Sequence, residues 1–251
     1  MQPTIVNSND KYLDRLTHTE NSVCVTTSPP AKYCALDMDV FSKGDLKRKN
    51  VEHFIRQGFV KTYNANVAIS MPWLLSVKDA KYKAALGIRS AVDTLFIEQY
   101  LSEPIEQAIA KNLSKRDIEC SGNNAISRHE IAEIGHLYSN GKRFTLPLLL
   151  VTAISLFCND YKYMVFSGTE HVLKLIAKAG VNCWFIAKAK KESLNGAQDN
   201  WGSYYETNPK VVIISLLEVM TLINNHPVYA SMFEHLNKKI AKTTSSLRAS
   251  G

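Results

Sequence analysis

The sequence predicts an α/β protein with a mixed, mostly antiparallel central sheet flanked by helices. Its 251 residues are enough to bury one sizeable core. Apolar residues make up 45% of the chain and charged residues 21%, close to the averages of globular proteins. Segments with helical spacing of apolar residues also alternate with short runs that suit strands.

The chain divides into three parts by composition. Residues 1–42 are rich in Asn, Thr, Ser and Pro and show no sustained period, which predicts a loosely structured arm. Residues 43–237 carry the alternating pattern and form the predicted main domain. Residues 238–251 are basic and predict a terminal helix that runs into a tail.

The first half of the main domain predicts a helix followed by a hairpin. Apolar residues recur at near-helical spacing among charges over residues 43–63, which indicates an amphipathic helix. Residues 66–77 and 81–90 are apolar runs around a polar break and predict two antiparallel strands. Helical spacing then covers residues 94–113. Because Pro104 is best tolerated in a first helical turn, this helix is expected to start near Ser102.

The second half predicts strands that alternate with helices. Residues 130–138 are expected as a strand, since turn-like residues and a long apolar helix over 146–157 follow them. The segments after this helix predict a strand, a short helix ended by a glycine, and a strand: 161–167, 170–179 and 182–187. The apolar run 211–223 suits either a strand or a helix.

Charge and targeting features narrow the class of protein. The net charge of +7 suits an acidic partner such as a coenzyme phosphate, an anionic lipid, an acidic carrier protein or nucleic acid. Without a basic-aromatic module, a nucleic-acid partner is not expected. Residues 1–15 contain no basic start with an apolar run, and residues 146–157 are too short to cross ~30 Å of bilayer, so a cytoplasmic protein without a transmembrane segment is expected.

The five cysteines are scattered and odd in number. Neither a CxxC pair nor a histidine at ligand spacing accompanies them, so the sequence predicts no disulfide framework and no metal site. The oligomeric state stays open, and a homo-oligomer is compatible with the sequence.

The order of elements resembles the acetyltransferase fold of the GNAT superfamily. In that fold a strand feeds a helix whose N-terminus receives a pyrophosphate, because free backbone N–H groups and the helix dipole favour anions. The corresponding segment here contains Ser139, Gly141, Lys142 and Arg143. The resemblance implies acyl-CoA or an acyl-phosphopantetheine as acyl donor, although the superfamily's loop is richer in glycine.

Four motifs carry a closer resemblance. They are FIEQYLSEPIEQ at 96–107, EIAEIGHLYS at 130–139, VFSGT at 165–169 and WGSYYETNPKV at 201–211. In this order they resemble the bacterial thermostable hemolysin family over residues 51–211. The name of that family records a lytic phenotype and no mechanism.

The same family is distantly similar to acyl-homoserine-lactone synthases, which acylate a small amine from an acyl carrier protein. Arg89 and Glu133 carry this weaker similarity. Because an amine must lose a proton as it attacks a thioester, we expect Glu133 as the catalytic base and His136 as the second candidate. For Glu133 the alternative role is a structural ion pair with Arg89. For His136 it is a hydrogen-bonded histidine of the core.

Strand alternation sets a condition on the two catalytic candidates. On a regular strand, Glu133 shares a face with Ile131 and Gly135, whereas His136 points to the other face. One site can therefore contain both side chains only if the strand has a bulge.

Further residues are expected to contact the substrate. Arg89 precedes the FIEQYL segment. Glu98, Gln99 and Glu106 belong to a helix-forming segment, in which Glu98 and Glu106 fall on one side. Their alternative role is a solvated helix face. The aromatic residues of the last motif predict a pocket wall or core packing: Trp201, Tyr204 and Tyr205.

Two functions from different classes follow from these observations. The favoured function is an acyltransferase that moves an acyl group from a thioester to the amine of a small molecule such as an amino acid, with an acyl carrier protein as a candidate partner. The alternative is a membrane-active hemolysin that lyses cells directly. That function would require an export signal or an exposed amphipathic segment, and neither is evident in the sequence.

Overall fold

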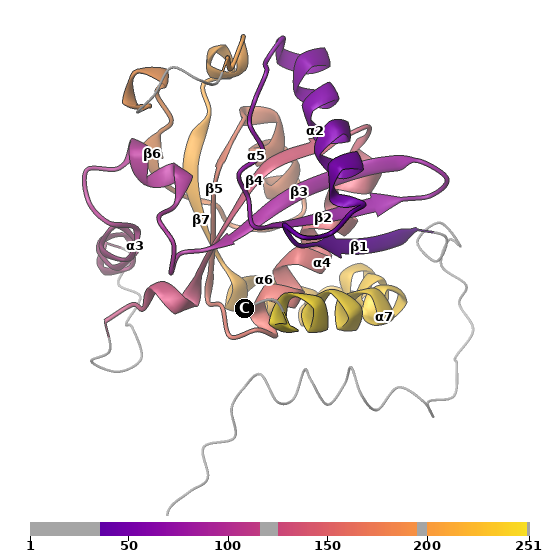
Figure 1. Cartoon of the computed structure of the whole chain (residues 1–251). Helices are drawn as coiled ribbons and strands as arrows, with labels where there is room; N and C mark the ends of the chain where they lie inside the picture. Colours follow the sequence, from indigo (N-terminus) through magenta and orange to yellow (C-terminus); the bar gives the residue numbers. More distant parts are fainter. Residues whose placement is uncertain (1–35, 116–124, 195–199, 250–251) are drawn as a thin grey trace, which may run out of the picture.

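The computed structural model describes residues 36–115, 125–194 and 200–249. Within these residues, seven strands form one sheet in the order β1-β2-β3-β4-β5-β7-β6 (Figure 1). Only β4 and β5 run parallel among the paired strands described, so the predicted mixed, mostly antiparallel sheet is confirmed. The strands are β1 (Asp37–Phe41), β2 (Trp73–Lys78), β3 (Tyr82–Ser90), β4 (Ile131–Ser139), β5 (Tyr163–Gly168), β6 (Trp184–Lys188) and β7 (Lys210–Ser215).

Helices cover both faces of this sheet. The longer ones are α2 (Arg48–Tyr63), α3 (Ile105–Ser114), α4 (Lys142–Phe157), α5 (Glu170–Lys178), α6 (Leu216–Asn225) and α7 (Pro227–Ala249). Short 3₁₀ turns are η1 (Phe96–Tyr100), η2 (Arg128–Glu130), η3 (Lys191–Ser193) and η4 (Tyr204–Thr207). In Figure 1, α2 lies across one face of the sheet, and α4, α6 and α7 lie together against the other.

The face that carries α4 holds the largest apolar core. Helix α4 is apolar all round, and nearly all of its residues after Arg143 are buried, as expected for a helix enclosed between a sheet and other helices. Ala132 and Ile134 of β4 point into this core. Ile131 of the same strand points to the opposite face, into a second core with η1 and α3. Successive residues of β4 therefore serve different faces, and this alternation decides which side chains reach the site.

Most predicted elements are confirmed, with shifted boundaries. The first helix begins at Arg48, and the first hairpin strand, expected over residues 66–77, covers only Trp73–Lys78. The ambiguous run 211–223 is both strand and helix, because β7 ends at Ser215 and this residue caps α6. Gly180 follows α5 with a φ of 83°, the left-handed position expected after a helix.

Both ends of the predicted main domain extend further than the pattern indicated. Asp37–Phe41, expected in the arm, pair as β1 with β2. Residues 238–249, expected as a terminal helix that runs into a tail, all belong to α7, whose Leu236 and Ile240 are buried in the large core. The rest of the arm, residues 1–35, lies outside the described residues.

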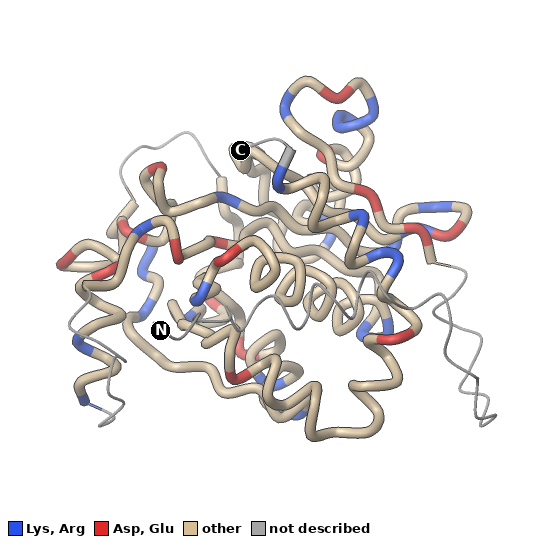
Figure 2. Tube along the Cα trace, turned by 90° about the horizontal axis from the view of Figure 1, so that it is seen from below, with Lys and Arg blue, Asp and Glu red and all other residues tan. Residues whose placement is uncertain are grey.

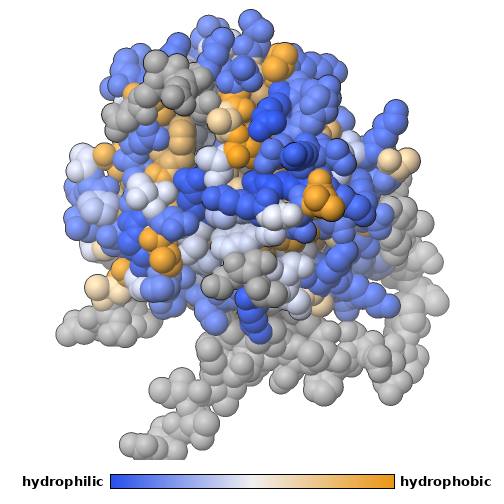
Figure 3. Space-filling view, in the orientation of Figure 1, coloured by the Kyte–Doolittle hydropathy of each residue, from blue (hydrophilic) through white to orange (hydrophobic). Residues whose placement is uncertain are grey.

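Charges and apolar side chains are spread over the surface. Basic and acidic segments are interspersed along the chain in Figure 2, and the face in Figure 3 is mainly hydrophilic with small, separate apolar patches. Arg48, one of the basic residues of the first helix, is only 4% exposed. Its guanidinium donates to the backbone oxygens of Phe41, Met71 and Pro72. Within the described residues, no helix combines the length and apolarity that crossing a bilayer requires.

Candidate active site

The site begins where β4 and β5 separate. The two strands pair over Ile131–Glu133 and Tyr163–Val165. Beyond these pairs, β4 continues to Ser139 and β5 to Gly168. Parallel strands that start together and then diverge leave an opening in the sheet, and backbone groups of both strands line it. A cavity of about 90 Å³ lies at this opening.

A β-bulge in β4 shapes the wall of the opening. Gly135 is opposite Gly87 of β3, whereas Tyr138 is opposite Ala85, so β4 has one residue more than β3 between these pairs. His136 occupies the bulge with a φ of 52°, in the left-handed region that non-glycine residues rarely adopt. A bulge changes the direction of a side chain without ending the strand.

The bulge places His136 on the same side as Glu133. The His136 ring lies 6.3 Å from the ring of Phe59 of α2, centroid to centroid, and Glu133 and His136 both line the cavity. The condition set by strand alternation is thus met, because the strand contains the bulge that a shared site requires.

The cavity is mostly apolar and aromatic. Its polar lining groups from β4 and β5 are Glu133, His136 and Ser167. Most of the rings that line it come from α2, η1, η4 and the segment before η4, and Met71 from the segment before β2 lines it too: Phe59, Tyr63, Met71, Phe96, Tyr100, Trp201 and Tyr204. Such a lining suits an apolar substrate with a few directing polar contacts.

Glu133 is a buried carboxylate held by backbone amides. Its residue is 1% exposed, and its two oxygens accept hydrogen bonds from the N–H groups of Phe96 (2.9 Å) and Ile97 (3.0 Å) of η1. Burial raises the pKa of Glu133 to about 7, although the two amides and Arg89 oppose this shift. A carboxyl group with a pKa near neutrality can take and return a proton at the pH of the cell.

Arg89 is the direct cross-strand neighbour of Glu133, as the ion-pair alternative required. The nearest nitrogen and oxygen of the pair are 4.0 Å apart, too far for a hydrogen bond. Arg89 instead donates to the backbone oxygen of Thr94 and to the backbone and side-chain oxygens of Ser70. The ion pair is thus present in a long form, and the amides of η1 make the close contacts with the carboxylate.

The aromatic residues of the last motif form one wall of the cavity. Trp201 and Tyr204 are 7% and 8% exposed and line it directly. The Tyr204 hydroxyl bonds to Ser167 of β5 (3.1 Å between the two hydroxyl oxygens), and burial raises the pKa of Tyr204. Tyr205 is outside the lining and instead shares a 2.6 Å hydrogen bond with Tyr100.

Two glycines make room for Met71 at the floor of the cavity. Gly87 and Gly135 are opposite each other on β3 and β4. A Cβ atom on Gly87 would come within 2.3 Å of Met71 Cγ, and one on Gly135 within 2.3 Å of Met71 Cε. Met71 therefore lies across the strand pair, next to the bulge.

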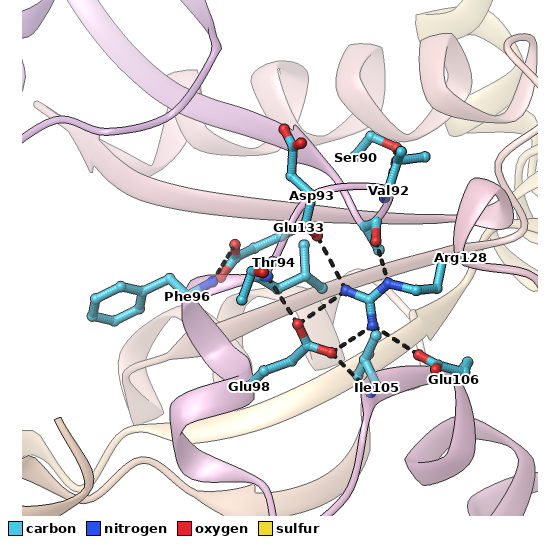
Figure 4. Close-up of polar contacts among 12 residues, drawn as sticks. Ser90, Val92, Asp93, Thr94, Phe96, Glu98, Ile105, Glu106, Arg128 and Glu133 are labelled. Carbon is cyan, nitrogen blue, oxygen red and sulfur yellow. Dashed lines mark hydrogen bonds and ion pairs between the residues drawn. The ribbon is translucent and has the colours of Figure 1, made fainter. Parts of the chain in front are cut away.

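The predicted substrate residues Glu98 and Glu106 lie elsewhere. Both carboxylates bind the guanidinium of Arg128, at 2.6 and 2.8 Å (Figure 4), and neither lines the cavity. Gln99 donates to the backbone oxygen of Phe96 at 3.2 Å. Glu98, Gln99 and Glu106 therefore lie around η1, outside the cavity in which a substrate contact was expected of them.

The predicted phosphate-binding segment forms the start of α4. Gly141 is the N-cap, and Lys142 and Arg143 are the exposed first two helical residues. The side chain of Ser139 donates to the backbone oxygen of Gly141 at 2.9 Å. The first turn contains no acidic residue and no side chain caps it. The N-terminus of α4, which follows the end of β4, therefore combines the positive end of the helix dipole with two cationic residues.

Several residues of the site were missed by sequence reasoning. Phe59, Tyr63, Met71 and Ser167 line the cavity, and Arg128 organises the neighbouring carboxylates. The only local signal for Arg128 was the capping-box pattern of η2, Ser127 with Glu130 three residues later. Among the described residues, no group of His, Cys, Asp and Glu is arranged to hold a metal ion.

Comparisons with known proteins agree with this architecture. A model of the family described as thermostable hemolysin matches residues 41–220, and curated proteins gave no match. The solved structure of TofI in an apo form is similar with a TM-score of 0.50 and 8% identity, covering 77% of this chain and 99% of that chain. This likeness is one of fold, and it agrees with the predicted α/β class with a mixed sheet flanked by helices.

Two further structures are similar at lower TM-scores. The AHL synthase LasI has a TM-score of 0.48 and 14% identity, covering 72% of this chain and 90% of its own. FeeM, an N-acyl amino acid synthase from uncultured soil microbes, has a TM-score of 0.44 and 10% identity, covering 74% and 96%.

Proposed function

This chain belongs to the thermostable hemolysin family, and we propose that it is an acyltransferase acting on a small-molecule amine such as an amino acid. The acyl donor is a thioester carried by coenzyme A or by the phosphopantetheine of an acyl carrier protein. The activities named for LasI and FeeM are those of these two proteins. The proposal for this chain depends on the geometry of its own cleft. The observation that carries it is the buried carboxylate of Glu133 on the bulged strand β4, at the opening between β4 and β5.

The proposed reaction assigns a role to each part of the cleft. The amine nitrogen attacks the thioester carbonyl carbon, an amide bond forms, and the C–S bond breaks. Glu133 accepts the proton that the amine loses and returns it to the departing thiolate. Its raised pKa suits both steps, because the group can be ionised before the attack and protonated after it. His136 is the second candidate for the proton transfer, since it lines the same cavity.

The phosphates and the acyl chain of the acyl donor bind to different parts of the site in this proposal. The phosphates lie at the N-terminus of α4 with Lys142 and Arg143, where the helix dipole favours anions. The acyl chain and the amine share the apolar cavity, which Trp201 and Tyr204 close on one side.

The test is an assay of purified protein with acyl-CoA and acyl-carrier thioesters of several chain lengths and a set of small amines. The expected result is an amide product identified by mass. Glu133→Gln, which keeps the size of the side chain, should lower the rate roughly 10²- to 10⁴-fold, as expected for loss of a general base.

A parallel assay separates this function from direct lysis. Pure lipid vesicles loaded with a dye are exposed to the protein without any substrate. If the protein releases the dye and forms no amide from any thioester, the acyltransferase proposal is wrong and the membrane-active alternative is correct.

A further inference from the structure

Arg128 of η2 is the most heavily bonded side chain near the site. Its guanidinium has five N–H donors, and all five are used (Figure 4). Nε donates to the backbone oxygen of Ala91. Nη1 donates to Glu98 (2.6 Å) and Glu106 (2.8 Å), and Nη2 donates to Glu98 (3.0 Å) and the backbone oxygen of Asp93 (3.1 Å). One side chain thus joins the loop after β3, η1 and α3.

Glu98 connects Arg128 to the residue before η1 and to the first residue of α3. Besides the two-pronged contact with Arg128, its carboxylate accepts hydrogen bonds from the N–H groups of Leu95 (2.9 Å) and Ile105 (3.1 Å). Leu95 precedes η1, and Ile105 is the first residue of α3. The segment from the residue before η1 to the start of α3 is therefore tied at both ends to a carboxylate that Arg128 itself binds.

The first two residues of η1 bind the carboxylate of Glu133. The amides of Phe96 and Ile97 each donate to one oxygen of that carboxylate, as Figure 4 shows for Phe96. We propose that Arg128 is a positioning residue for Glu133: through Glu98 it holds η1 so that both amides remain on the carboxylate. This inference rests on the proposed function for its importance to catalysis, but its structural part can be tested without activity.

The positive charge of Arg128 is not what stabilises the ionised form of Glu133. Arg128 is paired with two carboxylates, Glu98 and Glu106, so the cluster as a whole carries one negative charge and gives no net attraction for another anion. The groups that face Glu133 come from several elements: Arg89 of β3, Glu98 and Tyr100 of η1, His136 of β4, Tyr63 of α2 and Tyr204 of η4. Arg128 acts on Glu133 through the position of the amides.

The variant that separates position from charge is Arg128→Lys. Lysine keeps the positive charge but has three donors on a single nitrogen, so it cannot replace the planar two-pronged contact. When η1 is held less firmly, the hydrogen bonds from its backbone N–H groups to the Glu133 carboxylate weaken. The ionised form of Glu133 is then destabilised. The expected result is a rise in the titration midpoint of Glu133 by about one pH unit, because a hydrogen bond to a charged group is worth at least that much.

The midpoint is measured by ¹³C NMR of protein labelled at the glutamate carboxyl carbons, and the Glu133 signal is identified by its loss in Glu133→Gln. The pH profile of amide formation should shift in the same direction. Lys162→Gln is the matched control. It removes an ion pair to Glu130 of the same turn, η2, without a contact to η1, and should leave the midpoint unchanged.

Glu106→Gln is a milder second variant, because it replaces one charged partner of Arg128 by a neutral, weaker acceptor and leaves the other contacts. It should raise the midpoint by a smaller amount. If Arg128→Lys and Glu106→Gln lower the melting temperature but leave the Glu133 midpoint unchanged, Arg128 only stabilises the fold and the inference is wrong. If the wild-type protein makes no amide, the proposed function fails, while the NMR titration still decides the role of Arg128.

Discussion

Glu133 is a carboxyl group that the fold keeps both buried and hydrogen-bonded. Burial disfavours the charged form, and the amides of Phe96 and Ile97 favour it. Burial has the larger effect, so the pKa rises to about 7. The same balance that suits Glu133 to proton transfer makes its ionised form a cost to the folded protein.

This cost predicts how stability depends on pH. The folded-state pKa of Glu133 lies above its ordinary value of 4.5, so between these values the folded state binds more protons than the unfolded state. Stability from this group is therefore full below about pH 4.5, falls as the pH rises to about 7, and is constant above. The total loss is at most about 3 kcal/mol.

Urea unfolding of wild type and Glu133→Gln at pH 5 and pH 8 checks this prediction. Other titrating groups cancel in the comparison of the two proteins. The wild type should lose more stability than the variant over this range. Parallel pH dependences would show that Glu133 ionises at its ordinary pKa.

The strand pair β3–β4 owes its close packing to two glycines with different tolerances. A Cβ on Gly87 would meet Met71 near its backbone, at Cβ and Cγ, whereas a Cβ on Gly135 would meet the terminal methyl group, Cε. The end of a methionine side chain can move, but its first atoms cannot move without the backbone. The two positions therefore respond differently to the same added methyl group.

We expect Gly87→Ala to destabilise the protein by about 1–3 kcal/mol, the usual cost of overpacking, and Gly135→Ala to cost less. Chemical denaturation of both variants measures the difference. Met71→Ala combined with Gly87→Ala should recover part of the loss, because alanine lacks the Cγ atom of Met71, which would be nearest to the added methyl group. Equal costs for the two glycines would contradict this account of Met71.

Helix α4 contributes its N-terminus to the proposed donor site. Replacing Lys142 and Arg143 by Gln should raise the KM for acyl-CoA by roughly 2- to 5-fold for each residue, the effect of one charge at a helix end. The kcat should stay unchanged, because both side chains are exposed and neither lines the cavity that contains Glu133.

An acyl thioester of N-acetylcysteamine, which lacks phosphates, is the control substrate. Its KM should be the same for wild type and the Lys142→Gln, Arg143→Gln double variant. If the two substrates respond alike, the phosphates do not bind at the start of α4.

The whole molecule depends on chain segments that lie far apart in sequence. Helix α7, at the C-terminal end, packs on α4 and on β1, the first described strand. Lys242 of α7 forms a 2.6 Å ion pair with Asp39 of β1, and Arg248 donates to the backbone oxygen of Cys158 after α4. The two ends of the described chain thus close the same face of the sheet.

Ile240→Ala in α7 should cost about 2–5 kcal/mol, because the side chain is fully buried in the large core. Lys238→Ala, two residues earlier and exposed, should change stability by less than about 0.5 kcal/mol. Thermal or urea unfolding distinguishes the two. A small effect of Ile240→Ala would mean that residues 238–249 behave as the tail that composition suggested.

Local patterns were enough to predict most helices and strands, and the resemblance of the element order and of four motifs to known proteins implied the mixed sheet and the family. Periodicity, proline and glycine act over a few residues, so they are readable in a single sequence. The same patterns placed Glu133 on a strand and showed that His136 could join it only through a bulge. The bulge itself depends on pairing with β3, about fifty residues earlier, and carried no local signal.

Only the tertiary structure decided which side chains share the cleft. Strand alternation leaves the partners of Glu133 open, whereas the packing of η1 against β4 brings the amides of Phe96 and Ile97 to it. Glu98 and Glu106 looked like substrate residues because their spacing suits one helix side, yet Arg128, 30 and 22 residues further along the chain, binds both. A carboxylate's role depends on the donors that folding brings within hydrogen-bond distance, and these come from distant parts of the sequence.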